Sequence, residues 1–369
     1  MKLPLAEVFL FEMLFAAAAF AADSTSVQPG ISWSGFVDVY YSKNFNSPSN
    51  QMNQLRNFDI YENQFGLNLA KLTVQGQAQP VGFRIDIGFG TANDVVQGLL
   101  NPLTGAASPM TSTLDLVEQA YLTAVVPVGS GLTVDVGKFT TLMGYEVIET
   151  NGNWNYSRSL LFAWAVPYYH TGIRLTYPVA NNFTATLCLV NGWNTVIDNN
   201  RSKSVALGLN YSPTSTTTLT LNGISGFEQP AGVHYGKRDV CELIVTQQVG
   251  ENLSLAADAV YGRERVASVL NIWKGIAAYT KYNLDSESDI ALRGEIYYDP
   301  QDYATGVTLP KATFKEITAT YEYRPWSPLI LRLEARDDFA NGNLFISASS
   351  PFPARTSQPT LLLGAIATF

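Results

Sequence analysis

The chain has 369 residues and a formal net charge of −8, and charged residues make up 15% of it. An ordinary soluble domain has roughly 25% charged residues, so this sequence is poor in charge. Aromatic residues reach 12% and the mean hydropathy is +0.04. These values exclude a disordered chain and a bundle of membrane-spanning helices. The acidic balance and the lack of a basic cluster argue against a nucleic-acid partner.

The N-terminal segment is typical of a secretory signal peptide. Lys2 precedes an apolar stretch, and Ala19-Phe20-Ala21 fits a small-residue cleavage motif. We therefore expect a signal peptide over residues 1–21 and one mature domain over residues 22–369. Beyond residue 22 the longest unbroken apolar run covers residues 160–166, far short of the about 20 residues of a membrane-spanning helix. A secreted all-β protein and a bacterial outer-membrane barrel both fit these observations.

Alternation of apolar and polar residues dominates the rest of the chain and predicts β-strands. A clear example is Phe83, Ile85, Ile87 and Phe89, which interleave with Arg84, Asp86 and Gly88. The pattern predicts about 16 strands, near residues 31–41, 58–77, 82–90, 114–126, 132–139, 171–177, 183–190, 204–211, 218–225, 238–248, 253–261, 272–283, 289–299, 313–323, 329–338 and 360–369.

The connections between these strands alternate in length. Short turns such as residues 127–131 and 250–252 follow the even-numbered strands. Longer loops follow the odd-numbered strands, near residues 42–57, 91–113, 140–170, 191–203, 226–237, 262–271, 300–312 and 339–359. This rhythm favours an antiparallel, up-and-down transmembrane β-barrel with short periplasmic turns and long outer loops, since a Greek-key sandwich has no reason to keep it. A barrel of this size leaves a water-filled interior.

The last strand has apolar residues at every second position up to a terminal aromatic residue. Such a strand resembles the signal that the outer-membrane barrel-assembly machinery reads, and the residues concerned are Leu361, Leu363, Ala365, Ala367 and Phe369. An ordinary final strand is the simpler interpretation of the same pattern. Together with the predicted signal peptide, the pattern places the protein in the bacterial outer membrane, in contact with its lipid.

The longest loop, residues 140–170, contains two tryptophans and the apolar run 160–166. An exposed loop seldom carries so much apolar surface, so this one should be packed. One interpretation is that it folds into the barrel and narrows the pore; the other is that it packs on the rim or extends the sixth strand. The candidate constriction residues are Glu146, Glu149, Trp154, Asn155, Tyr156, Arg158 and Trp164.

The same region carries a family resemblance. Residues 127–139, 153–159, 167–172 and 189–194, which include Asn153-Trp154-Asn155-Tyr156-Ser157-Arg158-Ser159, look like segments of the OmpL-like β-barrel porin family. The best match spans about residues 115–200. The resemblance implies an outer-membrane porin of undefined substrate, with no catalytic residues to carry over.

Charged residues at the polar positions of the strands are predicted to face the lumen. Five are basic and ten are acidic, which indicates a mildly cation-favouring channel; alternatively, these charges only pair across the wall. They are Asp38, Glu62, Arg84, Asp86, Asp135, Arg174, Glu242, Asp258, Arg293, Glu295, Glu316, Glu322, Arg332, Glu334 and Arg336.

The sequence gives little support to catalysis. His170 and His234 belong to no metal-binding spacing, and no nucleophile elbow occurs. Cys188 and Cys241 are expected on opposite faces of non-adjacent strands, which argues against a disulfide. The sequence therefore predicts a porin that is not an enzyme, has no cofactor or metal, and passes small hydrophilic solutes or ions. A homo-oligomer, a non-conducting structural or adhesive barrel, and a sheath for an electron-transfer partner stay open, whereas an outer-membrane hydrolase is disfavoured.

Overall fold

The computed structural model describes residues 30–77, 80–110, 112–230 and 235–369. The predicted signal peptide, residues 1–21, lies outside these described residues. Within them, no helix combines the length and apolar character needed to cross a membrane.

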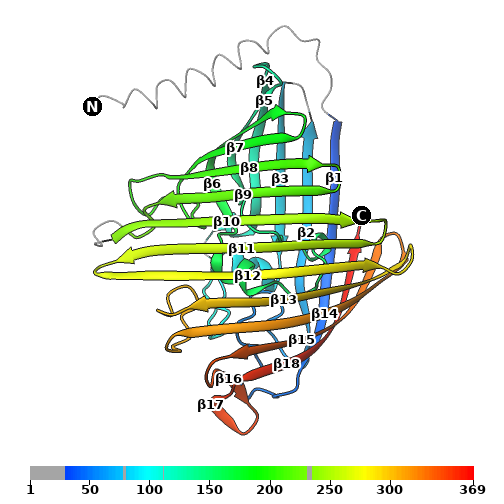
Figure 1. The fold of residues 1–369 in the computed structure, drawn as a ribbon, viewed down its shortest axis with the longest axis vertical. Helices are drawn as coiled ribbons and strands as arrows, with labels where there is room; N and C mark the ends of the chain where they lie inside the picture. The colour runs from blue at the N-terminus through cyan, green and yellow to red at the C-terminus, as the bar shows by residue number, and fades with distance from the viewer. Residues whose placement is uncertain (1–29, 78–79, 111, 231–234) are drawn as a thin grey trace.

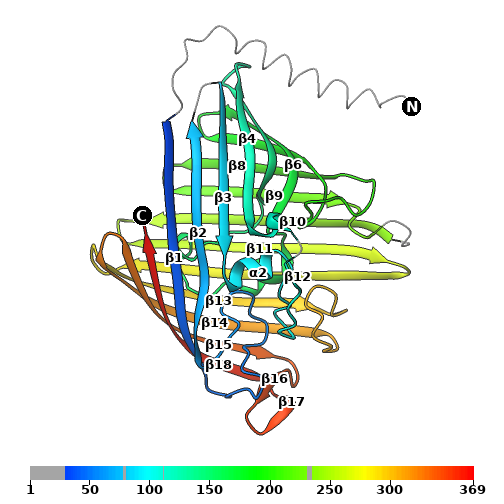
Figure 2. The same ribbon diagram turned by 180° about the vertical axis from the view of Figure 1, so that it is seen from behind.

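The described chain forms a closed antiparallel barrel, which confirms the predicted fold class (Figures 1 and 2). Its neighbouring strands follow the order β1-β18-β15-β14-β13-β12-β11-β10-β9-β8-β7-β6-β5-β4-β3-β2, so the first and last strands meet. The barrel strands are β1 (Gly30–Asn44), β2 (Gln64–Gln77), β3 (Val81–Phe89), β4 (Val117–Val126), β5 (Leu132–Thr140), β6 (Tyr169–Ala180), β7 (Phe183–Val190), β8 (Ser204–Thr214), β9 (Thr217–Gly226), β10 (Tyr235–Val249), β11 (Leu253–Val266), β12 (Val269–Asn283), β13 (Ser288–Asp299), β14 (Ala312–Trp326), β15 (Leu329–Ala340) and β18 (Ser357–Thr368).

Smaller elements lie in the long loops. A short helix, α2 (Thr91–Val96), follows β3, and a 3-10 turn, η2 (Thr113–Leu116), precedes β4. The 3-10 turn η3 (Thr150–Gly152) and the short π-helix η4 (Leu161–Ala165) lie between β5 and β6. The hairpin β16 (Phe345–Ser347) and β17 (Ser350–Arg355) precedes β18.

Side chains alternate between the two faces of the barrel wall. On β13, Ile290, Leu292 and Ile296 are exposed on the outside, whereas Arg293 and Glu295 are buried inside. The closed sheet pairs the backbone groups of every strand, and the outward apolar side chains can then contact lipid. Exposed aromatic residues gather at both ends of this outer face, Trp33, Tyr282, Tyr323 and Trp326 at the short-turn end and Phe65, Phe89 and Phe339 at the long-loop end.

Two predicted boundaries are wrong. The second strand begins at Gln64 rather than at residue 58, and residues 58–63 belong to the preceding loop. The predicted long connection 262–271 is a two-residue turn, since β11 and β12 stay paired up to Val266 and Val269. The outer ends of these strands carry charge, for example Arg263 and Glu264, so the apolar alternation stops before the hydrogen-bonded ladder does.

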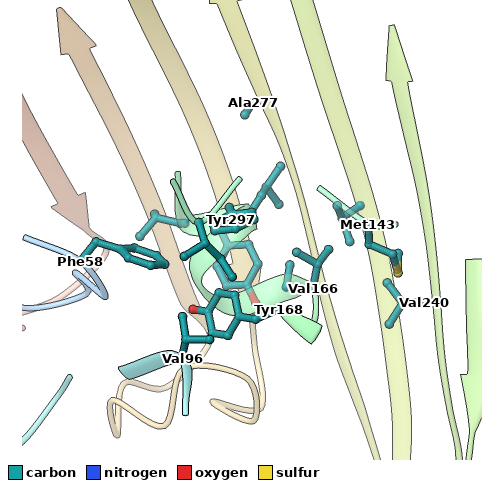
Figure 3. Close-up of a cluster of buried hydrophobic side chains, with 14 of the residues drawn as sticks. Phe58, Val96, Met143, Val166, Tyr168, Val240, Ala277 and Tyr297 are labelled. Atoms are coloured by element: carbon teal, nitrogen blue, oxygen red, sulfur yellow. The ribbon is translucent and has the colours of Figure 1, made fainter. Parts of the chain in front are cut away.

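The interior of the barrel contains a hydrophobic cluster that the strands alone do not build. Figure 3 shows Phe58 and Tyr168 from the loops near Tyr297 of the barrel wall, and Met143 near Val240 of β10. A barrel this wide has no packed core of its own. The loops that enter it therefore decide how much space remains.

Candidate functional site

Residues 141–168, which we call the inner loop, lie across the barrel interior. The two ends of the loop meet at the wall, where the Thr141 N–H donates to the Tyr168 carbonyl at 3.0 Å. Between these ends the loop hydrogen-bonds to side chains of β1, β9, β10 and β12 to β15. The long loop thus packs inside the barrel rather than on its rim.

Carboxylates of the barrel wall bind N–H groups of the inner loop. Glu242 accepts from the Gly144 N–H at 2.9 Å, and Glu334 accepts from the Ser157 N–H at 3.0 Å. Glu295 accepts from the first two N–H groups of the 160–166 run, at 2.7 and 2.6 Å. Buried backbone N–H groups need partners, and most of this loop has no regular ladder to supply them. These wall carboxylates fill that need.

Arginines of the same wall bind the carbonyl groups of the loop. Arg332 donates to the carbonyls of residues 150, 153 and 155 at 2.9, 2.6 and 3.1 Å. Arg336 donates to the Arg158 carbonyl at 2.6 Å, and Arg293 donates to the Ser157 carbonyl at 2.6 Å. Arg293 also ion-pairs with Glu146 of the loop at 2.7 Å. Side chains of the wall from β13 to β15 therefore bind both the N–H groups and the carbonyl groups of the loop backbone.

Arg158 lies within the loop and does not line open space. Its guanidinium donates to the carbonyls of Val147, Ile148 and Tyr156 and lies 4.6 Å from the centre of the Phe58 ring. Burial lowers the pKa of this guanidinium, and the negative charges of Asp38 and Glu146 oppose that shift. Arginine stays protonated in proteins, so Arg158 is a buried cation that ties two parts of the loop together.

The other predicted loop residues anchor the loop in different directions. Trp154 packs on Tyr145, whose ring lies 4.6 Å from that of Tyr279 on β12. Trp164 donates from its indole nitrogen to the Leu55 carbonyl at 3.3 Å, and Asn155 donates to Thr320 on β14 at 2.8 Å. Tyr156 and Glu149 reach the side of the barrel near β1 and β2.

Residues 45–63, which we call the capping loop, also enter the barrel, and the sequence interpretation missed them. Arg56 is fully buried and ion-pairs with Asp59 and, at 2.8 Å, with Asp338 on β15. Phe58 packs on Phe162 of the inner loop, with ring centres 6.0 Å apart. Residues 58 and 60 are apolar, and the alternation predicts that they begin a strand. The available signal of a buried turn was the pair Arg56 and Asp59, which are oppositely charged, three residues apart and flanked by apolar residues.

Open space remains between the inner loop and the wall formed by β1 to β6. The cavity there has a volume of about 580 Å³, and its charged lining residues are Lys71, Arg84, Glu146, Glu149 and Arg174. Lys71 contacts three carboxylates, with Asp86 at 2.9 Å, Glu118 at 3.1 Å and Glu149 closest of all. This lysine links the inner loop to the wall beside the cavity.

Two arginines present part of their surface to the same cavity. Arg84 ion-pairs with Asp86 at 2.9 Å, and Arg174 ion-pairs with Asp135 at 2.9 Å and covers the Phe139 ring. Their side chains are 34% and 20% exposed, whereas the two aspartates behind them are almost fully buried. The cavity wall thus exposes more cationic than anionic surface at these pairs.

The structure places nearly all of the charges predicted to face the lumen on the inner face of the barrel wall. Glu62 lies instead in the capping loop, where it pairs with Lys43 at 3.4 Å. The others lie on barrel strands with side chains buried or half-buried on the inner face, namely Asp38, Arg84, Asp86, Asp135, Arg174, Glu242, Asp258, Arg293, Glu295, Glu316, Glu322, Arg332, Glu334 and Arg336. Because many of them bind the inner loop or each other, their number alone does not give the charge of a solute pathway.

The candidate residues for other chemistry have structural surroundings. His170 is buried, with its ring nitrogens 3.0 Å from the Thr141 hydroxyl and 2.9 Å from the Gly192 carbonyl; His234 lies outside the described residues. Cys188 faces inward on β7 and Cys241 faces outward on β10, as expected from the alternation. In the described part of the chain, no group of three His, Cys, Asp or Glu residues could hold a metal ion.

Comparison with known proteins supports the architecture. The family model described as putative beta-barrel porin-2, OmpL-like, matches residues 30–369. No curated protein is significantly similar to the chain in sequence.

Solved structures share the fold at low sequence identity. An anion-selective porin from Comamonas acidovorans is 10% identical, with a TM-score of 0.66 over 93% of this chain and 100% of that one. The outer-membrane channel DcaP of Acinetobacter baumannii is 11% identical, with a TM-score of 0.62 over 95% and 100%. The trimer form of OmpT from Vibrio cholerae is 11% identical, with a TM-score of 0.58 over 92% and 99%. At this level of identity the likeness concerns the fold alone.

Proposed function

This chain belongs to the OmpL-like β-barrel porin family, and we propose that it lets small hydrophilic solutes and ions cross the bacterial outer membrane by passive diffusion. The observation that carries this proposal is the cavity beside the inner loop, inside a closed barrel with an apolar outer face. The mechanism needs no cofactor and no catalytic group. Solutes diffuse through water, and the inner loop limits their size.

The inner loop is the constriction in this proposal. Its segment from residue 144 to 161 is held by β10 and β13–β15 and also reaches Asp38 and Lys71 on the opposite wall. The pathway therefore runs through the cavity that remains beside these contacts, past Lys71, Arg84 and Arg174. Glu146 and Glu149 line the same pathway from the side of the inner loop. The field in the pathway is then set by these groups, which line the cavity, rather than by Arg158, which does not line it.

The membrane setting of the proposal is supported by the outer face of the barrel. The aromatic residues at the two ends of the barrel suit the two interfaces of a lipid bilayer. Along β18, Leu361, Leu363, Ala365, Ala367 and Phe369 are at least partly exposed, and their recognition by the barrel-assembly machinery stays a prediction. Three further points stay predictions: export by the segment 1–21, the single mature domain 22–369 and a homo-oligomer. The trimer form of the Vibrio cholerae barrel is an example of such an oligomer.

A non-conducting barrel is the second candidate function. The capping loop packs directly on the inner loop, where Asn57 donates to the Ala163 carbonyl at 2.9 Å and Arg158 stacks on Phe58. Two loops that fill the interior together would suit a structural or adhesive barrel. Electrical recording separates the two candidates, because only a porin carries current.

Substitution of Lys71 by glutamine tests the proposed pathway. In planar bilayers under a salt gradient, the wild-type protein is expected to give discrete current steps. Lys71→Gln is expected to shift the reversal potential toward that of the cation, because Asp86, Glu118 and Glu149 then lack their shared counter-charge. The control is Lys315→Gln, which removes the same charge from an exposed position on β14.

Each outcome of this recording bears on the proposal. Folded wild-type protein that never conducts would favour the non-conducting barrel. Current steps with the same reversal potential in Lys71→Gln and the wild type would place the pathway away from Lys71. An equal shift in Lys315→Gln would attribute the effect to overall charge.

A further inference from the structure

One pair of neighbouring barrel strands is joined by no turn or loop. β1 and β18 come from opposite ends of the chain and pair from Phe36 with Thr368 up to Asn44 with Thr360. Gly35 and Phe369 extend this pairing with two backbone hydrogen bonds of 3.1 and 3.0 Å. We call this pair the seam. Every other neighbouring pair is also tethered by its connecting segment, so the seam is the place where the barrel can open without stretching a loop.

The ring of Tyr156, from the inner loop, lies directly on the seam. Gly364 of β18 faces the lumen, and a Cβ atom at this position would lie only 2.5 Å from two carbons of the Tyr156 ring. Gly364 is paired with Tyr40 of β1, whose ring centre lies 5.9 Å from that of Tyr156. Because glycine has no side chain, Gly364 leaves the space on β18 that the Tyr156 ring occupies.

Hydrogen bonds of Tyr156 reach the strands on both sides of β18. The hydroxyl donates to Asp38 on β1 at 2.6 Å. The Tyr156 N–H donates to Glu334 on β15, which also accepts the next N–H along the loop at 3.0 Å. One loop residue thus contacts β1, β18 and β15 in succession.

The middle of β18 has no comparable bond of its own. Its inward residues there are Leu362, Gly364 and Ile366, which carry no polar side-chain group. Leu362 forms a buried cluster with Tyr40 and Tyr156. The side-chain hydrogen bonds at this level therefore come from the inner loop, which links β1 and β15 across β18.

We propose that Tyr156 locks the seam, so that docking of the inner loop and closure of the barrel stabilise each other. This role goes beyond the proposed conduction of solutes and does not depend on it. A barrel with the loop undocked would open between β1 and β18 before any other strand pair. Docking of the loop would in turn be weakened whenever the seam is open, because Asp38 and Gly364 then separate.

Hydrogen exchange of the folded full-length mature protein, followed by mass spectrometry, tests this inference. Tyr156→Ala is expected to speed the exchange of mid-strand amides in β1 and β18 by about tenfold, while β8 and β9 keep their protection. The matched control is Tyr145→Ala. It removes an equally large ring from the same loop, but one that packs on Tyr279 of β12, far from the seam.

A milder variant keeps the inference testable if Tyr156→Ala does not fold. Tyr156→Phe removes only the hydroxyl that binds Asp38 and is expected to speed exchange at the seam by a smaller factor. Faster exchange in β1 and β18 for the Tyr156 variants alone supports the lock. Equal effects of Tyr145→Ala and Tyr156→Ala on the seam, or no effect of either Tyr156 variant, would overturn it.

Discussion

Replacement of residues 142–167 by a short Gly/Ser linker is expected to raise the single-channel conductance several-fold and to admit larger solutes. The linker can close without strain, because Thr141 and Tyr168 are already hydrogen-bonded to each other at 3.0 Å. Without the inner loop, the space beside β9 to β15 fills with water, and the narrowest part of the pathway widens. Arg293, Arg332 and Arg336 stay paired with Glu316, Glu322 and Asp338 of the wall. Glu242, Glu295 and Glu334 lose their N–H partners from the loop, face this water and should favour cations.

The control for this change is the same linker in place of the mostly exposed residues 102–110, in the loop after β3. This segment lies outside the interior, so the conductance should stay at the wild-type value. A loop-replaced barrel that folds and still conducts like the wild type would show that the inner loop does not limit the current.

Arg293→Leu is expected to lower the free energy of unfolding by about 3–5 kcal/mol, because it leaves buried carboxylates without their partner. Arg293 is 1% exposed and pairs with Glu146 of the inner loop and Glu316 of β14, both at 2.7 Å. Denaturant titration of the detergent-folded protein, followed by tryptophan fluorescence, measures the loss.

Arg324→Leu provides the comparison, since Arg324 also contacts two carboxylates, Asp289 and Glu322. Its side chain is 29% exposed and the inner loop lies elsewhere, so solvent screens the pair and the loss should stay below about 1 kcal/mol. Similar losses for the two arginines would mean that the contact with the inner loop adds no special stability.

The strands of the barrel could be predicted from the sequence because their signal is local. In a strand such as 329–338, apolar residues mostly face the lipid and polar residues mostly face the interior, so the polarity of a residue indicates the face on which it lies. The prediction was wrong where this relation ends. Near Arg263 and Glu264 the paired strands continue although outward and inward positions are both polar. In residues 58–63 apolar side chains pack inside the barrel without belonging to a strand.

The candidate site was predictable only in part, because its contacts join distant residues. The apolar run 160–166 indicated a packed loop, and the loop does lie inside the barrel. Nothing near Arg332 or Glu295 in the sequence indicates that they bind the backbone of a loop more than 100 residues away. The same is true of Arg158, whose guanidinium looks like a pore charge in the sequence and is buried among loop carbonyls in the structure.

The most direct test of the pathway compares two threonines on opposite sides of the inner loop. Thr73 on β2 lines the cavity, whereas Thr318 on β14 is fully buried beside Arg293 and Glu316. Each is changed to cysteine in a variant whose native cysteines are replaced by alanine, and a charged, water-soluble thiol reagent is added during single-channel recording. We expect the reagent to reduce the current through Thr73→Cys and to leave Thr318→Cys unchanged unless the inner loop is replaced. A current that falls in Thr318→Cys and not in Thr73→Cys, with the loop intact, would contradict a pathway between the inner loop and β1 to β6.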